Sequence, residues 1–207
     1  MSFQFGQRSN IEGGRTPHHG GEDGVAAAYT EQVAARQHWP ALDKTDEELL
    51  QELEQLLTIH AAGNPYGDDG SFAASIRSLS PGLRVMAATH WLDVSLTLDS
   101  ITWHFGNFGE HGLVAETELG LRELGLQELA DCFVQARDLM VPLLRDRTEA
   151  EGDPYEILER AGQRERADDI DRRAWEIDNL GPGESVIYKA WIQYTRKHPE
   201  RVFPAVH

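Results

Sequence analysis

The sequence predicts an all-α protein, a single compact multi-helix domain with a flexible, glycine-rich N-terminal arm. Apolar residues recur at three-to-four spacing through most of the chain, which is the period of an amphipathic helix. Helix start and stop signals flank these runs, among them Thr45 with Glu48 and, further along, Gly125. With 207 residues, of which 40% are hydrophobic, the chain is long enough to bury one core.

The domain organisation follows from composition. Residues 1–24 contain six of the 19 glycines and almost no apolar periodicity, so they are predicted to form the flexible arm. We expect N-terminal helices in residues 25–82 and a further helical segment in residues 83–203. Residues 25–203 are expected to fold as one compact unit.

The N-terminal segment contains three expected helices. The first runs from residue 25 to about residue 38, before Pro40. The second begins at the capping box of Thr45 and Glu48, and Gly63-Asn64-Pro65 ends it. The third, over residues 72–79, stops at Ser80-Pro81-Gly82. The second has the clearest apolar stripe, which consists of Leu49, Leu50, Leu53, Leu56 and Leu57.

Residues 84–105 fit two structures. Val94, Leu96 and Leu98 alternate with other residues, as strands do, and Asp99-Ser100 would then be a hairpin turn. The same apolar residues also cover most faces of a helix. Asp-Ser lacks the glycine or asparagine that favours a two-residue turn. We therefore predict one helix over residues 84–105, buried on most sides, with Trp103 in the core.

The remainder reads as a loop followed by helices. Residues 106–112 are expected to form a glycine-rich loop, and two helices are then expected to meet at Gly125 as a corner or hairpin. Pro142 is expected to bend or restart the second of them. Residues 149–178 are strongly charged with a thin apolar stripe, and residues 186–194 predict a last amphipathic helix.

Two groups of short motifs stand out in this half of the chain. The first joins Glu116-Thr117, a Leu121-x-x-Leu124-Gly125 helix end and an acidic-Leu-Ala run at residues 127–130. The second joins Asp171-x-x-x-Trp175 to a helix that ends at His198-Pro199. Together they resemble the C-terminal domain of a bacterial DNA-mimic protein family, over roughly residues 85–203. That family's Asn-Gly-Gly-Phe motif is absent, because the matching register reads Leu98-Asp99-Ser100-Ile101.

This resemblance implies a non-enzymatic protein that occupies the DNA-binding face of a transcription factor or other DNA-binding protein. Composition agrees, because the formal net charge of −16 argues against direct nucleic-acid binding and suits a basic protein partner. No apolar run reaches the roughly 18 residues of a membrane-spanning helix, and no signal peptide is visible. A cytoplasmic protein without a membrane partner is expected, and the sequence is compatible with a homodimer.

Catalytic and metal sites are not expected. His90 and His104 would lie about 21 Å apart along one helix, which is too far to share a metal. His104, Glu110 and His111 could form a three-ligand set, but nothing like His-Glu-x-x-His is present. Cys132 lies among apolar residues and is typical of a small buried hydrophobe. We therefore predict no catalytic residue, no metal and no cofactor.

The acidic surface is the remaining candidate. Residues 149–178 carry a net charge of −6. As one helix they would span about 45 Å, a length over which duplex DNA carries roughly 26 charges. Mimicry therefore requires acids from several helices on one face. The predicted partner-binding residues are Asp46, Glu47, Glu52, Glu149, Glu151, Asp153, Glu156, Glu159, Asp168, Asp169 and Asp171.

Two other functions remain open at this level. One is an immunity-type or adaptor protein that binds a partner without imitating DNA. The other is an enzyme with an unrecognised site. Competition by DNA for the partner would separate the first from mimicry, and substrate turnover would identify the second.

Overall fold

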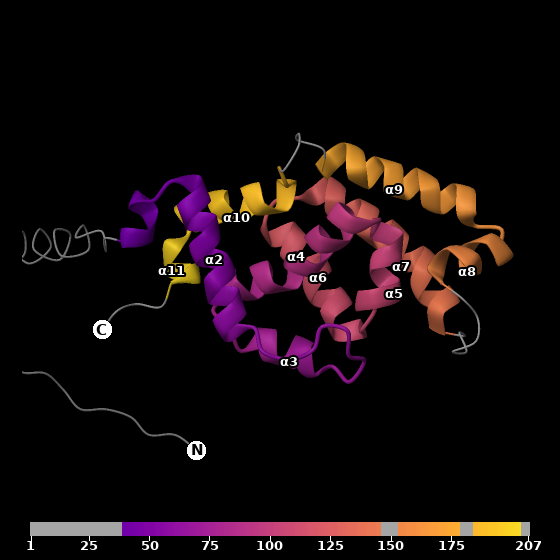
Figure 1. Ribbon diagram of the computed structural model, residues 1–207, viewed down its shortest axis with the longest axis horizontal. Helices are drawn as coiled ribbons and strands as arrows, with labels where there is room; N and C mark the ends of the chain where they lie inside the picture. Colours follow the sequence, from indigo (N-terminus) through magenta and orange to yellow (C-terminus); the bar gives the residue numbers. More distant parts are fainter. Residues whose placement is uncertain (1–38, 146–152, 179–183, 204–207) are drawn as a thin grey trace, which may run out of the picture. The chain divides into compact units, whose positions relative to one another are not determined.

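The computed structural model describes residues 39–145, 153–178 and 184–203 (Figure 1). The predicted arm, the helix expected at residues 25–38, and the candidate acids Glu149 and Glu151 lie outside these ranges. Within them all regular structure is helical and no strand occurs, so the all-α prediction is confirmed. None of the helices in this part of the chain is long and apolar enough to cross a membrane.

The elements run in chain order as η1 (Pro40–Asp43), α2 (Asp46–His60), α3 (Ser71–Arg77), α4 (Pro81–Leu98), α5 (Ile101–Phe108), α6 (His111–Glu123), α7 (Gln127–Arg145), α8 (Pro154–Arg160), α9 (Arg164–Asp178), α10 (Val186–Lys197) and α11 (Pro199–Val202).

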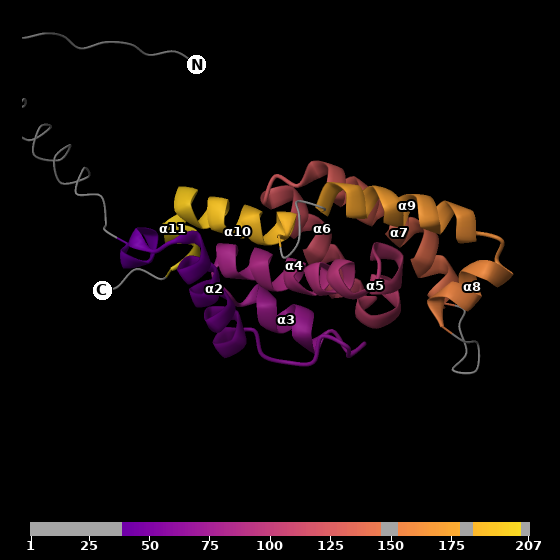
Figure 2. The ribbon, with the colours of Figure 1, turned by 45° about the horizontal axis from the view of Figure 1, so that its top comes forward.

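Helix α4 lies at the centre of the described unit, with α2, α3, α5, α6, α9, α10 and α11 packed around it (Figures 1 and 2). Its closest neighbour is α6, and Gly120 of α6 makes the approach possible. A Cβ atom at Gly120 would lie 3.0 Å from Cγ2 of Thr89 and 3.2 Å from the Val85 carbonyl oxygen. The Thr117 hydroxyl donates to the Ala88 carbonyl oxygen at 2.9 Å across the same contact. The family motif residue Thr117 is therefore part of the α4–α6 packing.

The single helix predicted over residues 84–105 is wrong, and so is the hairpin alternative. Helix α4 ends at Leu98 and α5 begins at Ile101, with Asp99 and Ser100 between them. Ser100 is the N-cap of α5, and its hydroxyl accepts a hydrogen bond from the Trp103 amide at 3.0 Å. The chain is helical on both sides of Asp99-Ser100, because serine there caps a new helix rather than turning a hairpin.

The break also moves Trp103 out of the core. The inward face of α5 is formed by Ile101, His104, Phe105 and Phe108. Trp103 is half-buried at the edge of this face, where its ring lies 5.2 Å from that of Tyr155, measured between centroids.

The joint at Gly125 agrees with the prediction. Gly125 has φ +79°, the left-handed conformation that glycine adopts freely. Its amide donates to the Arg122 carbonyl oxygen at 3.1 Å, and the Leu126 amide donates to that of Leu121 at 2.9 Å. These two bonds form a Schellman motif, which ends α6 and lets α7 fold back against it. Helix α7 then continues through Pro142 to Arg145.

The charged region splits into two helices. Helices α8 and α9 are separated near Gly162, which has φ +63°. The last amphipathic helix is present as α10, whose N-cap is Ser185. Its Trp191 is fully buried and donates from Nε1 to the Thr89 hydroxyl at 2.9 Å, so α10 is fixed to α4.

Candidate protein-binding surface

The predicted acids that the structure describes fall into two separate groups. Asp46, Glu47 and Glu52 lie on α2, which packs against η1, α4 and α10. The second group is on or beside α8 and α9, and α8 packs against α5, α7 and α9. Figures 1 and 2 both show α2 and α8 at opposite ends of the described helices. The second group consists of Asp153, Glu156, Glu159, Asp168 and Asp169, all exposed.

Asp171 does not belong to this surface. Its side chain is buried, and its two oxygens accept hydrogen bonds from the Thr102 amide at 2.9 Å and the Thr102 hydroxyl at 2.7 Å. Burial raises the pKa of Asp171, and the bonds from Thr102 oppose that shift. Asp171 therefore connects α9 to the first turn of α5, where a carboxylate is favoured by the free amides and the helix dipole.

The acids of α9 are largely compensated by arginines of the same helix. Arg164 Nε lies 2.8 Å from Asp168 Oδ1 in an i,i+4 pair. Arg172 lies 2.7 Å from Asp169 and 3.5 Å from Glu176. Exposed pairs of this kind add little stability, but each arginine cancels part of the field of its neighbours. Helix α9 is therefore a weaker source of negative potential than its acid content suggests.

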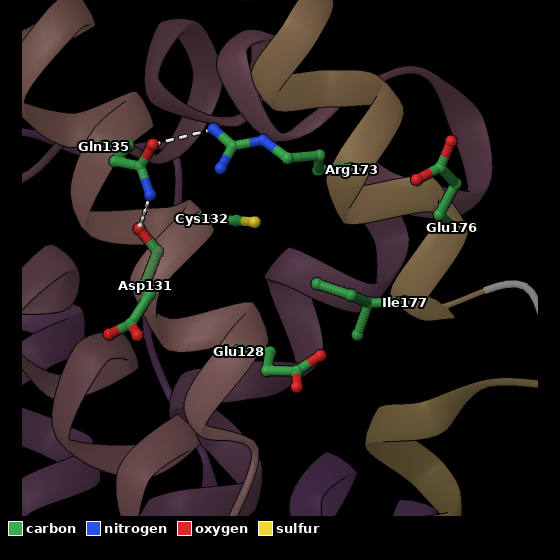
Figure 3. A pocket seen from close by; sticks show the side chains of 7 residues that line it. All are labelled: Glu128, Asp131, Cys132, Gln135, Arg173, Glu176 and Ile177. Carbon is green, nitrogen blue, oxygen red and sulfur yellow. Dashed lines mark hydrogen bonds between the residues drawn. The ribbon is translucent and has the colours of Figure 1, made fainter.

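A groove of about 630 Å³ runs between α7 and α9 (Figure 3). Its walls carry Glu128 and Asp131 from α7 and Glu176 from α9. Arg173 donates to the Gln135 side-chain oxygen at 2.7 Å and brings positive charge into the same groove. The mixture of charges does not select strongly for a cation or an anion.

Cys132 lies in this groove with its side chain buried. Burial raises the pKa of the Cys132 thiol, although Arg173 opposes the shift. A raised pKa keeps the sulfur protonated near neutral pH and lowers its reactivity. These properties describe a packing residue.

Helix α2 is the most one-sided acidic element. Asp46–His60 contains no Lys or Arg, and its acids are Asp46, Glu47, Glu48, Glu52 and Glu54. The capping box is formed as predicted, with the Glu48 amide donating to the Thr45 hydroxyl and the Thr45 amide donating to Glu48. The hydrogen bond from the Thr45 amide lowers the pKa of Glu48, so this carboxylate stays ionised.

Two basic side chains from outside α2 reach its N-terminal part. Arg196 of α10 lies 2.5 Å from Asp46 and also donates to the carbonyl oxygens of Leu42 and Lys44. Lys44 lies 3.3 Å from Glu52. Among the described ion pairs none involves Glu47 or Glu54.

The histidines considered as ligands are placed apart. His104 is fully buried, its Nδ1 lies 2.9 Å from the Ser95 hydroxyl, and burial lowers its pKa to about 3. Glu110 accepts hydrogen bonds from the Gly112 and Leu113 amides and caps α6, while His111 is exposed. In the part of the chain that the structure describes, no group of three or more His, Cys, Asp or Glu side chains is arranged to hold a metal ion.

The motif residue Glu116 is buried between two arginines. Arg84 donates to it from Nε at 2.6 Å and from Nη2 at 2.9 Å, and Arg77 donates from Nε at 2.7 Å. These contacts join α3, α4 and α6, so the Glu116-Thr117 motif supports the fold. Helix α2 also carries Glu48 and Glu54, which the sequence prediction did not name, and the lack of any Lys or Arg in residues 46–60 is the signal in the sequence that marks this helix.

Comparison with known proteins agrees with the resemblance found in the motifs. The family described as DMP19-like protein matches residues 77–198, more than half of the chain. No curated protein matches the chain, and no solved structure does. The matched region begins at Arg77 and includes Glu116, Thr117 and Gly125, whose contacts hold α3, α4, α6 and α7 together. The chain therefore belongs to the DMP19-like family, a family of DNA-mimic proteins.

Proposed function

We propose that this protein is a DNA mimic whose acidic α2 surface occupies the DNA-binding face of a basic, DNA-binding protein. The α2 surface is defined as the exposed and half-exposed acids Asp46, Glu47, Glu48, Glu52 and Glu54. The observation that carries this proposal is an acidic helix without a basic residue, in a chain of net charge −16 that belongs to a DNA-mimic family. The second acidic group, on α8 and α9, is a weaker choice because Arg164 and Arg172 pair with its members Asp168 and Asp169.

The size of the charge sets what α2 can imitate. The fifteen residues of α2 span about 22 Å. Duplex DNA of that length carries about 13 phosphate charges, against the five carboxylates of α2. Helix α2 can therefore replace a few phosphate contacts on one side of a duplex. The groups on a DNA-binding protein that match such a row are Lys and Arg side chains that contact the backbone of DNA.

The test begins with capture of the partner by the full-length protein from cells that express it naturally. Duplex DNA should compete for the captured partner. Affinity should fall steeply with salt, because the Debye length decreases from about 10 Å at 0.1 M to about 3 Å at 1 M. A partner whose binding is indifferent to both DNA and salt would contradict mimicry and favour the immunity-type or adaptor function.

Two matched triple variants locate the surface. Glu47→Gln, Glu52→Gln and Glu54→Gln together remove three charges from α2. Asp168→Asn, Asp169→Asn and Glu176→Gln remove three from α9. We expect the α2 variant to slow association at least tenfold and to flatten the salt dependence, because charges of this kind mainly steer encounter, and we expect the α9 variant to have a much smaller effect. The reverse order would assign the interface to α9.

A further inference from the structure

A mostly apolar groove lies directly beside the acidic helix. It has a volume of about 440 Å³ and is formed by α2, the residue after it, α3 and α4. This volume is at the small end of the range of roughly 300–1,000 Å³ that ligand sites occupy. It suits a single side chain or one aromatic ring. The lining residues are Glu54, Leu57, Thr58, Ala61, Phe72, Ala87, His90 and Trp91.

One end of the groove is electronegative. Burial raises the pKa of Asp93 and of Tyr188, and the negative charge of nearby Glu54 raises both pKa values further. Asp93 is buried, accepts a hydrogen bond from the Ser185 hydroxyl and is also near Asp178. Within the described residues no Lys or Arg side chain pairs with Glu54. Glu54 therefore supplies the negative charge among the residues that line the groove.

His90 does not supply the missing positive charge. Its Nδ1 lies 3.3 Å from the Tyr188 hydroxyl, and its ring packs edge-on against Trp91 at 5.0 Å between centroids. Burial lowers the pKa of His90, so the imidazole is neutral near pH 7. The groove thus offers a neutral donor or acceptor at His90 and a negative charge at Glu54.

The apolar lining continues to an exposed aromatic residue. Trp91 packs against Phe108 at 5.2 Å and against Tyr66 at 5.9 Å between ring centroids, and Tyr66 is 60% exposed. Ile59, on α2, is 69% exposed. Exposed aromatic residues beside a small pocket are typical of the energetically dominant part of a protein interface. A charge-only imitation of DNA has no use for such a feature.

We propose that this groove binds an aromatic or branched aliphatic side chain of the partner that carries a cationic group next to it, Lys or Arg. The ring or branched chain enters between Leu57, Phe72 and Trp91, and the cation faces Glu54. This inference rests on the proposed function. The groove would give the partner a contact on this protein that DNA does not offer. Charge complementarity selects the occupant, since an anionic group in the groove would meet the carboxylate of Glu54.

Three small probes test the site without a partner. Phenethylamine, 2-phenylethanol and phenylacetate present the same ring with a positive, neutral or negative end. Each is titrated into the full-length protein and followed by NMR at the Trp91 indole N–H and the His90 ring. We expect phenethylamine to bind about tenfold more tightly than the alcohol, which is a modest electrostatic preference, and phenylacetate to bind more weakly than either. Equal binding of all three, or none at tens of millimolar, would overturn the proposal.

Variants then identify the residues. Ala61→Phe fills the groove mouth from a half-buried lining position and should abolish the shifts. Ala62→Phe adds the same ring at an exposed position outside the groove and should leave them intact. Glu54→Gln should reduce the preference for the amine over the alcohol. Circular dichroism of each variant establishes that it is folded. Unchanged binding in Ala61→Phe, or an unchanged preference in Glu54→Gln, would refute the assignment.

The same variants separate this inference from the proposed function. If the groove binds its partner residue, Ala61→Phe should weaken the captured complex at least tenfold at high salt, where the α2 charges are screened, and Ala62→Phe should not. If DNA displaces the complex but Ala61→Phe does not weaken it, DNA mimicry is supported and the groove proposal is contradicted. If DNA does not displace the complex but Ala61→Phe disrupts it, the groove proposal is supported and DNA mimicry is contradicted.

Discussion

Replacing Glu116 by glutamine tests whether the family motif acts through the fold. Glu116 on α6 is 4% exposed and accepts hydrogen bonds from Arg84 on α4 and Arg77 on α3. Glutamine has the same shape, but it carries no charge and its amide nitrogen would point a donor at guanidinium donors. The variant therefore loses the charge-assisted bonds while the packing volume stays the same.

The expected cost follows from the exposure of the partners. A hydrogen bond to a charged group contributes about 1.5–3 kcal/mol, and three of them converge on Glu116. The side chains of Arg77 and Arg84 are 46% and 38% exposed, so water can solvate them once the carboxylate is gone. That exposure reduces the penalty well below the value for a fully buried pair. We expect Glu116→Gln to lower the free energy of unfolding by about 2–3 kcal/mol at pH 7.

The pH dependence gives a second, independent readout. Burial acts to raise the pKa of Glu116, but the bonds from Arg84 and Arg77 outweigh it, so the folded-state pKa lies below the ordinary value. A depressed pKa means that the stabilisation is complete above the unfolded-state pKa of about 4.3 and disappears as the pH falls through the folded-state pKa. The stability difference between the natural protein and Glu116→Gln should therefore shrink below about pH 4.

Urea denaturation followed by far-ultraviolet circular dichroism measures both quantities. Glu118→Gln, two residues further along α6, is the comparison, because Glu118 is 24% exposed and its pairs with Arg122 and Arg137 lie at the surface. It should cost about 0–1 kcal/mol. Equal stability of Glu116→Gln and the natural protein, or a difference that persists unchanged at pH 3, would refute the reasoning.

Three further stability predictions follow from buried or half-buried side chains. Trp103→Ala should cost less than the 3–5 kcal/mol typical of a fully buried tryptophan, about 1–2 kcal/mol, because Trp103 is half-buried; a larger loss in urea denaturation would contradict its edge position. Trp191→Phe should cost about 1–3 kcal/mol through the lost bond to Thr89 and the lost volume, and an unchanged melting temperature would contradict this. Asp171 has a raised pKa, so its contribution to stability increases as the pH falls from above the folded-state pKa to below the unfolded value of about 3.9. The free energy of unfolding of the natural protein should therefore rise relative to that of Asp171→Asn as the pH falls through this range. A difference that does not change with pH would contradict the prediction.

Local signals placed several helix ends correctly, because they act within a few residues, but the loop expected at residues 106–112 is mostly helical, since α5 runs to Phe108 and α6 begins at His111. The capping box at Thr45 and the left-handed Gly125 both end or begin a helix through bonds to amides and carbonyls nearby. The break at Asp99-Ser100 was different. Serine is compatible with a turn, a helix interior or an N-cap, and only Asp171, 69 residues away, supplies the second acceptor for the start of α5. No periodicity in residues 84–105 contains that information.

The sequence shows which residues are acidic, but it does not show which of them are buried or paired with arginine. The sequence treats Asp171 and Asp169 alike, yet Asp171 faces Thr102 and Asp169 pairs with Arg172 in water. Helix periodicity places Asp171 near the stripe of Ile170 and Ala174, which is a partial signal for burial. Helices α2 and α8 lie at opposite ends because of the way all the helices pack around α4. This packing depends on the whole core and not on any short stretch of sequence.

The distribution of acids decides what a net charge of −16 can do. Buried Asp93, Glu116 and Asp171 are held by hydroxyls, amides or arginines and present little charge to a partner. Asp168 and Asp169 are exposed but lie beside arginines of their own helix. Because a DNA-binding protein responds to potential at its own Lys and Arg side chains, these acids count less than their number suggests. Helix α2 has no basic residue of its own. Arg196 and Lys44 pair with Asp46 and Glu52 from outside the helix, so the charges of Glu47, Glu48 and Glu54 are the ones that add along it. That helix, together with the apolar groove beside it, is where removal of charge and filling of the groove should have the largest effects on a partner.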